Sequence, residues 1–385
     1  MRRTIYTDEH QAFRETIRAF IAREVVPNYD QWEVAGKVPL SLYRRLGDLG
    51  VLGIAVPGQY GGAGVDGLRF SAIIAEESAR AGVVLGALRV HADIVLPYLL
   101  DLGTEEQLRR WMPGFVSGEM MTAIAMTEPG TGSDLAGIHT TARREDDHYI
   151  LNGAKTFITG GANAHRVLVV CRTSPPDPDN RRTGLSILAV DTASEGFGVG
   201  RKLDKIGLKA QDTAELSFQN VRVPVTDLLG EEGQAFGYLS RHLVQERLSI
   251  ALGAAGTAAA AVELTVAYVN EREVFGRPLA AFQNTRFVLA ECQAETQAAL
   301  ALADRCLEAH ESGDLTPADV AAAKLFCTEV LGRVADKCLQ LHGGYGYIRE
   351  YPIARLYADA RVCRIYGGSN EVQKTLIGSS LGLKK

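Results

Sequence analysis

The first segment that could do chemistry is a loop of small residues that follows a predicted strand. It reads Ala125-Met126-Thr127-Glu128-Pro129-Gly130-Thr131-Gly132-Ser133-Asp134. Glycines let backbone amides come close to a ligand, and the Thr127 and Ser133 hydroxyls can donate hydrogen bonds. Taken alone, this loop is better explained as an ordinary turn.

A second segment places an aromatic ring and a hydroxyl at the end of a predicted strand. It reads Asn152-Gly153-Ala154-Lys155-Thr156-Phe157-Ile158-Thr159-Gly160. The Asn-Gly pair predicts a hairpin turn. Residues i and i+2 share one face of a strand, so Phe157 and Thr159 could offer a flat apolar surface and a donor to one ring. For either residue by itself, ordinary packing is the simpler explanation.

A third segment is a glycine cluster at the end of a predicted helix. It reads Gln340-Leu341-His342-Gly343-Gly344-Tyr345-Gly346-Tyr347. Backbone N–H groups in such a cluster can bind a pyrophosphate. A plain helix C-cap is the simpler explanation for this cluster alone.

One acidic residue, Glu246, interrupts the apolar stripe of a predicted helix. The stripe consists of Phe236, Leu239, Leu243 and Ile250, whose spacings place them on one helical face together with Glu246. An acid in this place is buried or lines a cavity, and both raise its pKa, which suits it to remove a proton from carbon. The alternative is a solvated Glu246, or one paired with His242.

Three blocks of the chain, which differ in hydrophobic pattern and composition, must position these segments. Helical spacing dominates the first ~120 residues, where Thr104 and Gln107 form a capping-box signature. Short Val- and Thr-rich runs follow up to about Pro224, and long helical segments return from Gly233. This order predicts an α+β multidomain protein with a helical domain (1–119), a β-domain (120–229) and a C-terminal helical domain (230–385).

A possible nucleotide-binding motif in the first block is a false match. Gly62-Ala63-Gly64-Val65-Asp66-Gly67 fits the pattern G-x-G-x-x-G, which needs a strand running directly into its first glycine. The surroundings are helical instead. We therefore expect a tight loop between helices.

The composition excludes several other functions. The 385 residues carry 41 basic and 46 acidic side chains, so no excess of positive charge predicts a nucleic-acid partner. No cluster has metal-ligand spacing, and six cysteines without a C-x-x-C pair predict reduced, buried thiols of a cytoplasmic protein. The N-terminus lacks the apolar stretch of a signal peptide. The longest uncharged apolar run, Leu248 to Val262, is 15 residues, which is too short to span a membrane.

Together and in this order, the three segments resemble the acyl-CoA dehydrogenase family. Further matches are Val56-Pro57-x-x-Tyr60-Gly61-Gly62, Arg272-x-x-Phe275-Gly276-x-Pro278, Gln283 and Ile365-Tyr366-Gly367-Gly368-Ser369-Asn370-Glu371. The resemblance extends over nearly the whole chain. It implies an N-terminal helical domain, a middle β-barrel-like domain and a C-terminal four-helix bundle, assembled as a homotetramer or homodimer, with FAD as cofactor.

The resemblance also implies which residues contact FAD. Thr127 and Thr159 would hydrogen-bond the isoalloxazine, and Phe157 would pack against it where the family commonly has Trp. Gly132 and Ser133 would lie beside flavin and substrate. The ADP half would be held from the adjacent chain by Arg272, Phe275, Gln283, Gln340 and Gly344, and further contacts would come from Met126, Ser369 and Glu371. An ion pair with Glu271 or Glu273 is the alternative for Arg272.

The reaction implied is α,β-dehydrogenation of an acyl-CoA thioester to the trans-2-enoyl-CoA. Many family members carry the catalytic glutamate directly after the tyrosine of the last motif, where this chain has Gly367. In the branch that includes long-chain and isovaleryl-CoA dehydrogenases, the base comes from a helix of the C-terminal domain, and the matching residue is Glu246. Glu371 is the second candidate base. Gly367 would still offer its backbone N–H to the thioester oxygen, and Arg247 would lie near the CoA or form an ion pair.

Other functions stay open at this stage. An acyl group on a carrier protein fits the same motifs, and so does an oxidase of the same fold. A DNA-binding relative would need a basic tail, and the C-terminus offers only Lys384-Lys385. The placement of Glu246 disfavours a non-catalytic relative. The resemblance implies an electron-transferring flavoprotein as electron acceptor, whereas the motifs set neither the length nor the branching of the acyl chain.

Overall fold

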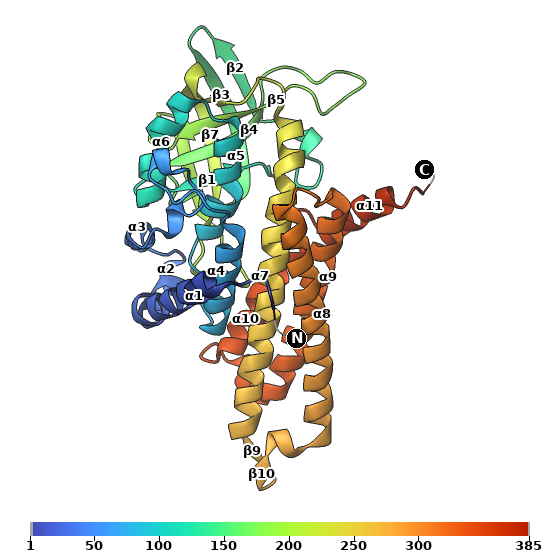
Figure 1. The fold of residues 1–385 in the computed structure, drawn as a ribbon. Helices are drawn as coiled ribbons and strands as arrows, with labels where there is room; N and C mark the ends of the chain where they lie inside the picture. The colour runs from blue at the N-terminus through green and yellow to red at the C-terminus, as the bar shows by residue number, and fades with distance from the viewer. Residues whose placement is uncertain (1–2, 384–385) are drawn as a thin grey trace.

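The computed structural model describes residues 3–383, which form a helical part, a sheet and a helical bundle in the expected order (Figure 1). The N-terminal part is made of helices joined by short turns, and the predicted capping box of Thr104 and Gln107 opens one of them. The segments are α1 (Asp8–Phe20), η1 (Ile21–Val25), η2 (Val26–Asn28), α2 (Tyr29–Ala35), α3 (Leu40–Asp48), η3 (Val51–Gly53), η4 (Gly58–Tyr60), α4 (Leu68–Arg80), η5 (Val90–Val95), α5 (Leu96–Leu102) and α6 (Glu105–Ser117). The G-x-G-x-x-G sequence lies between η4 and α4, with no strand before it, as expected.

The middle part is a mixed sheet with buried residues packed against it. Its strand order is β6-β7-β3-β2-β4-β5-β8, and β1 pairs in parallel with β4. The strands are β1 (Thr122–Ala125), β2 (Thr141–Glu145), β3 (His148–Thr159), β4 (Arg166–Arg172), β5 (Leu185–Asp191), β6 (Phe197–Lys202), β7 (Thr213–Pro224) and β8 (Leu228–Leu229). The central strand β4 is buried along nearly all its length, which accounts for its run of β-branched residues.

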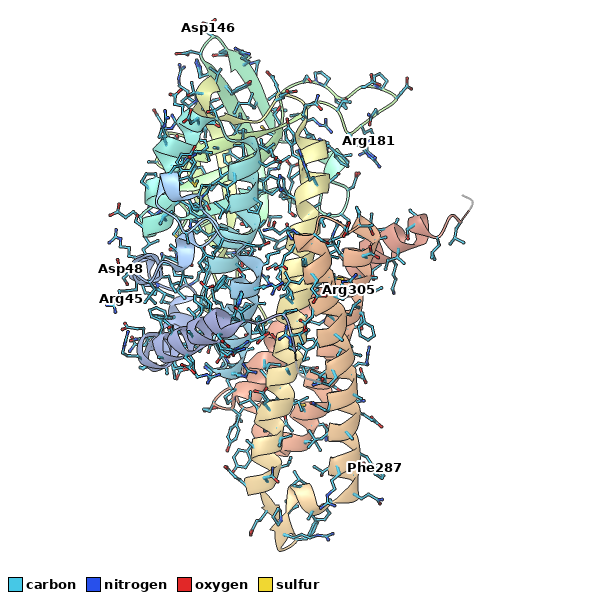
Figure 2. All side chains as sticks on the ribbon, in the orientation of Figure 1. Arg45, Asp48, Asp146, Arg181, Phe287 and Arg305 are labelled. Carbon is cyan, nitrogen blue, oxygen red and sulfur yellow. The ribbon has the colours of Figure 1, made fainter. Side chains whose placement is uncertain are left out.

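The predicted hairpin turn at Asn152-Gly153 is wrong. These two residues lie inside β3, where the pairing with β7 shifts by one residue at a β-bulge. The Asn152 side chain exchanges hydrogen bonds with Asn220 of β7, at 2.9 and 3.1 Å, and this pairing fixes the bulge. The turn between β2 and β3 lies earlier, at Asp146, which stands at the outer tip of the sheet with φ +49° (Figure 2). The pairing of β3 with β2 and β7 here overrides the turn preference of the Asn-Gly pair.

The C-terminal part is a bundle around the long helix α7. Its core consists largely of alanine, leucine, valine and cysteine, and the many small alanines and cysteines let the helices approach closely. All six cysteines are free thiols, as expected; five are buried and Cys363 is half-buried. The elements are α7 (Ala235–Glu271), β9 (Glu273–Val274), β10 (Arg277–Pro278), η8 (Leu279–Ala281), α8 (Gln283–Glu311), α9 (Pro317–His342), η9 (Gly343–Tyr347), α10 (Pro352–Ala360), η10 (Arg361–Arg364) and α11 (Asn370–Ser380).

Helix α7 connects all three parts of the molecule. Near its start, Ala235 and Leu239 belong to the apolar core formed by α5, α6 and the sheet. Farther along, Leu248 to Val262 pack in the bundle core with α4, α8 and α9. In Figure 1, α7 stands between the N-terminal helices and the rest of the bundle. Residues in its first half can therefore face the sheet, the N-terminal helices and the bundle together.

The expectation that no apolar segment is long enough to cross a membrane needs correction. Helix α7 has 37 residues and passes that test by length and composition, because a spanning segment tolerates a few charges that the uncharged run left out. Most of its apolar stretch is buried against the other helices of the chain. Its hydrophobicity is accounted for by its place in the core.

Candidate active site

Glu246 and Gly367 lie side by side, although they are far apart in the sequence. A Cβ atom on Gly367 would lie 3.4 Å from Glu246 Oε1. It would also overlap the Cδ1 atom of Ile250, one helical turn after Glu246 on α7. The two positions at which the sequence analysis considered a catalytic glutamate therefore open onto the same space. In this chain, Ile250 fills the volume that a side chain at position 367 would need.

The Glu246 side chain is enclosed by protein and only partly accessible to solvent. Burial raises its pKa, and the positive charges of Arg89, Arg247 and Lys324 oppose that rise. Within residues 3–383 the carboxylate forms no hydrogen bond or ion pair. An acid with a raised pKa and unoccupied oxygens can accept a proton from a neighbouring ligand.

The alternative pairing of Glu246 with His242 is wrong. The His242 Nε2 atom lies 2.9 Å from a carboxylate oxygen of Asp101 on α5, and the ring lies against Tyr98 at 4.3 Å between centroids. These contacts hold the imidazole away from Glu246. His242 and Glu246 are one turn apart on α7, but the His242 side chain is bound by residues of α5 and not by Glu246.

The glycine loop beside Glu246 is held in place by its carbonyl oxygens. Arg247 Nε donates to the Gly367 oxygen at 3.3 Å, and Lys324 Nζ and Gln373 Nε2 donate to the Gly368 oxygen at 2.6 and 2.8 Å. Both glycines have positive φ, +63° and +85°, a conformation that favours glycine. Among the described residues, no acceptor binds the Gly367 N–H. The loop thus presents a fixed, free backbone donor next to the carboxylate.

Lys324 is a site residue that the sequence analysis missed. Its side chain on α9 is fully buried, and burial lowers its pKa to about 8. A Cβ on Gly367 would lie 3.7 Å from Lys324 Cε, so this cation is near both the loop and Glu246. The signal that could have found it is the one that found Glu246, because Lys324 interrupts an apolar helical segment, Val320 to Cys327.

Arg247 and Glu371 differ in how the structure places them. Arg247 is buried and forms no ion pair in the described part of the chain; it contacts the glycine loop instead. Glu371 lies in the first turn of α11, exposed to solvent. Hydrogen bonds from its own backbone and Ser369 lower its pKa. A solvated carboxylate with a lowered pKa is poorly suited to be the base.

The first two motifs meet at one end of β3. The Thr156 N–H donates to the Thr127 oxygen at 2.9 Å, which joins the loop after β1 to the strand that carries Phe157 and Thr159. Buried Lys155 strengthens the junction, since its ammonium donates to the Met126 oxygen and to Glu128, both at 2.9 Å. Gly132 and Ser133 lie on the exposed part of the loop.

Phe157 is held in an unusual position, consistent with a surface for a planar ligand. Its φ is +59°, which is rare for a residue with a side chain, and the pairing with β7 is interrupted there by a second bulge. The ring is 67% exposed, although it is large and apolar. Thr159, two residues later, is partly exposed.

The residues expected at the ADP half lie elsewhere, at the far end of the bundle. Arg272, Gln340 and Gly344 line one open hollow of about 500 Å³. The hairpin β9–β10 marks this end in Figure 1, well away from the sheet. Phe275, at the hairpin, is 96% exposed, and Gln283 opens α8 nearby. One chain does not bring this group together with Thr127 and Phe157.

The alternative of a surface ion pair for Arg272 is wrong. Neither Glu271 nor Glu273 pairs with it; its guanidinium lies over the Tyr345 ring, 5.4 Å from the centroid. Its remaining N–H groups are thus free for an acceptor. A planar guanidinium with free donors is suited to bind phosphate oxygens.

A cavity of about 470 Å³ opens between α4, η5, α5 and α7, and its lining includes the sequence neighbours of Glu246 and Gly367 but not these two residues themselves. Tyr366, Gln245 and Arg89, which flank the two site residues in sequence or in space, contribute to its wall. Most of the wall is apolar and comes from Ala72, Ala75, Leu88, Leu96, Pro97, Leu100 and Leu252. The cavity is large enough for a flexible hydrocarbon chain.

Comparison with known proteins accounts for this arrangement. Models of the N-terminal, middle and C-terminal domains of acyl-CoA dehydrogenases match residues 7–119, 123–221 and 233–382. The chain belongs to the acyl-CoA dehydrogenase family. The fold and the enzyme class expected from the sequence are thereby confirmed.

Relatives of this acyl-CoA dehydrogenase are similar to it in sequence and structure over nearly its full length. A long-chain specific acyl-CoA dehydrogenase of pig mitochondria is 44% identical, over 98% of this chain and 88% of that protein. The crystal structure of an acyl-CoA dehydrogenase from Geobacillus kaustophilus has a TM-score of 0.96 at 45% identity, covering 99% of this chain and 100% of the other. A glutaryl-CoA dehydrogenase from Mycobacterium smegmatis, in complex with FADH2, has a TM-score of 0.89 at 29% identity and covers 98% and 95%.

Replacing Thr159 with Val tests its predicted contact with the flavin. We expect the Thr159→Val protein to fold, to show a shifted flavin absorption band and to bind FAD roughly three- to tenfold more weakly, because one hydrogen bond is lost. Spectra and titration of the apoprotein with FAD measure both effects. Thr141→Val, at an exposed position of β2, is the matched control and should change neither. An unaltered spectrum and affinity in Thr159→Val would show that the hydroxyl makes no such contact.

Replacing Lys324 with Met tests whether its charge acts on Glu246. A base works only when ionised, so catalytic efficiency rises with pH through the pKa of Glu246. Lys324 opposes the rise in that pKa, and its loss should therefore raise the pKa further and move the acid limb of the kcat/KM profile to higher pH. Lys324→Arg, which keeps a charge, should move the limb less. An acid limb that stays in place in Lys324→Met would contradict the electrostatic role.

Proposed function

We propose that this protein catalyses the flavin-dependent α,β-dehydrogenation of an acyl-CoA thioester to the trans-2-enoyl-CoA, with Glu246 removing the α-proton. The observation that carries the proposal is the position of Glu246 Oε1, 3.4 Å from where a Cβ of residue 367 would lie. A carboxylate occupies the space beside the glycine loop without occupying the family's commonest sequence position. Family membership and the near-complete match to long-chain enzymes support the same reaction.

Glu246 would act as a base whose strength is set by its surroundings. The α-proton of a thioester is far too weakly acidic for a carboxylate with the reference pKa of about 4.3. Burial raises the pKa of Glu246 and so strengthens the base. The charges of Arg89, Arg247 and Lys324 limit the rise, so the ionised form stays available. Both conditions must hold for proton transfer near neutral pH.

Gly367 would stabilise the negative charge that develops on the thioester oxygen. Its N–H is free, and the loop cannot turn easily because Arg247, Lys324 and Gln373 hold the two glycine carbonyls. A donor that is already oriented stabilises an enolate oxygen without reorganising. The absence of a side chain at position 367 does not impair this role.

The cofactor is proposed to be FAD, the flavin of the family. When bound, FAD supplies the acceptor for the hydride that leaves the substrate β-carbon. Thr127 and Thr159 would hold the ring by hydrogen bonds, and Phe157 would cover one of its faces. Met126, Gly132, Ser133, Ser369 and Glu371 are the further predicted contacts, and Ser133 and Arg247 would also contact the substrate. The exposed, strained position of Phe157 favours such a planar ligand.

A second copy of the chain would complete the cofactor site. Arg272, Gln340 and Gly344 line a hollow at the opposite end of the molecule from Phe157, so one chain cannot clamp both halves of one FAD. Large apolar side chains on the outside of the bundle also need a cover. Phe275 is 96% exposed and Phe287 is 58% exposed, and Phe287 projects from the lower part of α8 (Figure 2). We therefore expect a homodimer or homotetramer.

The electron acceptor is proposed to be an electron-transferring flavoprotein, a partner that fits the family. An acyl group on a carrier protein is the alternative substrate. Side-by-side assays with acyl-CoA and acyl-carrier substrates distinguish the two.

Replacing Glu246 with Gln tests the proposed base. We expect Glu246→Gln to bind FAD normally and to lose about a hundred- to ten-thousand-fold in the rate of flavin reduction by acyl-CoA, the usual contribution of a general base. Stopped-flow bleaching of the flavin band measures the rate. Glu263→Gln, on an exposed face of the same helix, is the control and should reduce at the normal rate. Near-normal reduction in Glu246→Gln would exclude it as the base.

A mixing experiment tests whether the site is shared between chains. Glu246→Gln and Arg272→Glu should each be inactive alone. In a mixed dimer, one of the two sites combines an intact Glu246 with an intact Arg272 from the other chain, so co-expression should restore roughly a quarter of the activity. If each chain instead clamps its own cofactor, the mixture stays as inactive as its parts.

A further inference from the structure

Among the polar residues that line the cavity, those that flank Glu246 on α7 and their neighbours on and beside α4 and η5 form one polar wall. This polar wall consists of Ser71, Arg89, Asp93, Gln245 and Ser249. It brings together side chains of α4, η5 and α7 and the residue that precedes η5. A cavity made only for a hydrocarbon chain gains nothing from polar groups, since each loses its water without a partner in the ligand. The polar wall therefore calls for its own explanation.

Arg89 is the member of the polar wall that has no acidic partner, although its guanidinium donates a hydrogen bond to the Tyr366 hydroxyl. Its guanidinium is enclosed by protein and lies over the Tyr366 ring, 5.0 Å from the centroid. No carboxylate in residues 3–383 forms an ion pair with it. Enclosed charges in proteins are normally paired and hydrogen-bonded. Donors of this guanidinium face the cavity, where a ligand could supply an acceptor.

Asp93 provides the acceptor side of the polar wall. The Ser71 and Ser249 hydroxyls donate to its carboxylate oxygens at 2.5 and 2.6 Å, and Gln245 Nε2 donates to its backbone oxygen at 3.0 Å. These bonds fix a buried carboxylate between three elements. Each serine oxygen still has free capacity as an acceptor. Asp93 lies in the π-helical turn η5, and Arg89 directly precedes this turn. The two residues are four apart, so their side chains share one side of the helix.

The polar wall thus offers a donor and, about one helical turn away, acceptors. A hydroxyl group both donates and accepts, so it matches both. A carboxylate on the substrate would match Arg89 but would be repelled by Asp93. A plain hydrocarbon would leave the Arg89 donors without a partner once the chain displaced water.

We propose that the acyl substrate carries a hydroxyl group, which accepts a hydrogen bond from Arg89 and donates one to Asp93 or to a serine oxygen. This inference rests on the proposed dehydrogenation and names its substrate class. Ser249 and Gly253, beside which the Arg89 guanidinium lies, follow Glu246 by about one and two turns of α7, so the hydroxyl is bound within about two turns of the proposed base. The substituted carbon is therefore near the reacting carbons, rather than at the far end of the chain.

The test uses the FAD-loaded enzyme and compares acyl-CoA substrates whose acyl chains have equal length. The rate of flavin bleaching gives kcat/KM for decanoyl-CoA and for a series of hydroxydecanoyl-CoA isomers. At least one isomer should exceed decanoyl-CoA by about tenfold, because a site built to hydrogen-bond a hydroxyl disfavours the analogue that lacks it. Arg89→Met should abolish this preference, and Ser249→Ala should reduce it. Leu100→Met, on the apolar wall of the same cavity, should retain it.

Three results would overturn the inference. In the first, decanoyl-CoA matches or exceeds every isomer. In the second, Arg89→Met lowers the rates of both substrate types by one common factor and moves the acid limb of the pH profile, which would limit Arg89 to tuning Glu246. In the third, no acyl-CoA of either type bleaches the flavin, and the proposed dehydrogenation itself fails. Activity on decanoyl-CoA with no hydroxyl preference separates failure of this inference from failure of the function.

Discussion

The site depends on the free energy needed to remove the Glu246 carboxylate from water. Burial alone raises the pKa of this acid, and if it acted alone the group would hold its proton. The positive charges of Arg89, Arg247 and Lys324 oppose that effect, and none of the three pairs directly with the carboxylate. The charge of Glu246 is thus stabilised from a distance while its oxygens stay free. A direct ion pair would stabilise the anion more and make it a weaker base.

The convergence of positions 246 and 367 means that this fold could place a carboxylate in the same space from either sequence position. Both backbone positions open onto one space, and a side chain from either one can fill it, but not from both. Here Glu246 enters from α7, and Ile250 occupies the volume that a residue at 367 would require. With a glycine at 367, in a conformation of φ +63°, the backbone N–H stays available although the carboxylate comes from position 246.

Much of the fold and part of the site could be predicted from the sequence. Periodicity gave the order of helices and strands, and it identified Glu246, because an acid in an apolar stripe is conspicuous on its own helix. The Asn152-Gly153 turn failed because a contact with distant Asn220 overrides the local preference. Lys324 and Arg89 were missed because their importance comes from contacts with other elements. Lys324 contacts the glycine loop, and Arg89 contacts Tyr366 and lines the cavity. Spacing within one segment carries no record of such neighbours.

The continuity of α7 has a consequence for engineering the molecule. Its first turns belong to the core beneath the sheet, its middle carries Glu246, the proposed base, and its later turns form the centre of the bundle. The middle and C-terminal parts consequently cannot be exchanged as independent modules with a relative by cutting inside this helix. A chimaera made that way would carry, on one helix, packing surfaces from two proteins that do not fit their new neighbours. Recombination points belong in the turn before Gln234, where the sheet has ended and the helix has not begun.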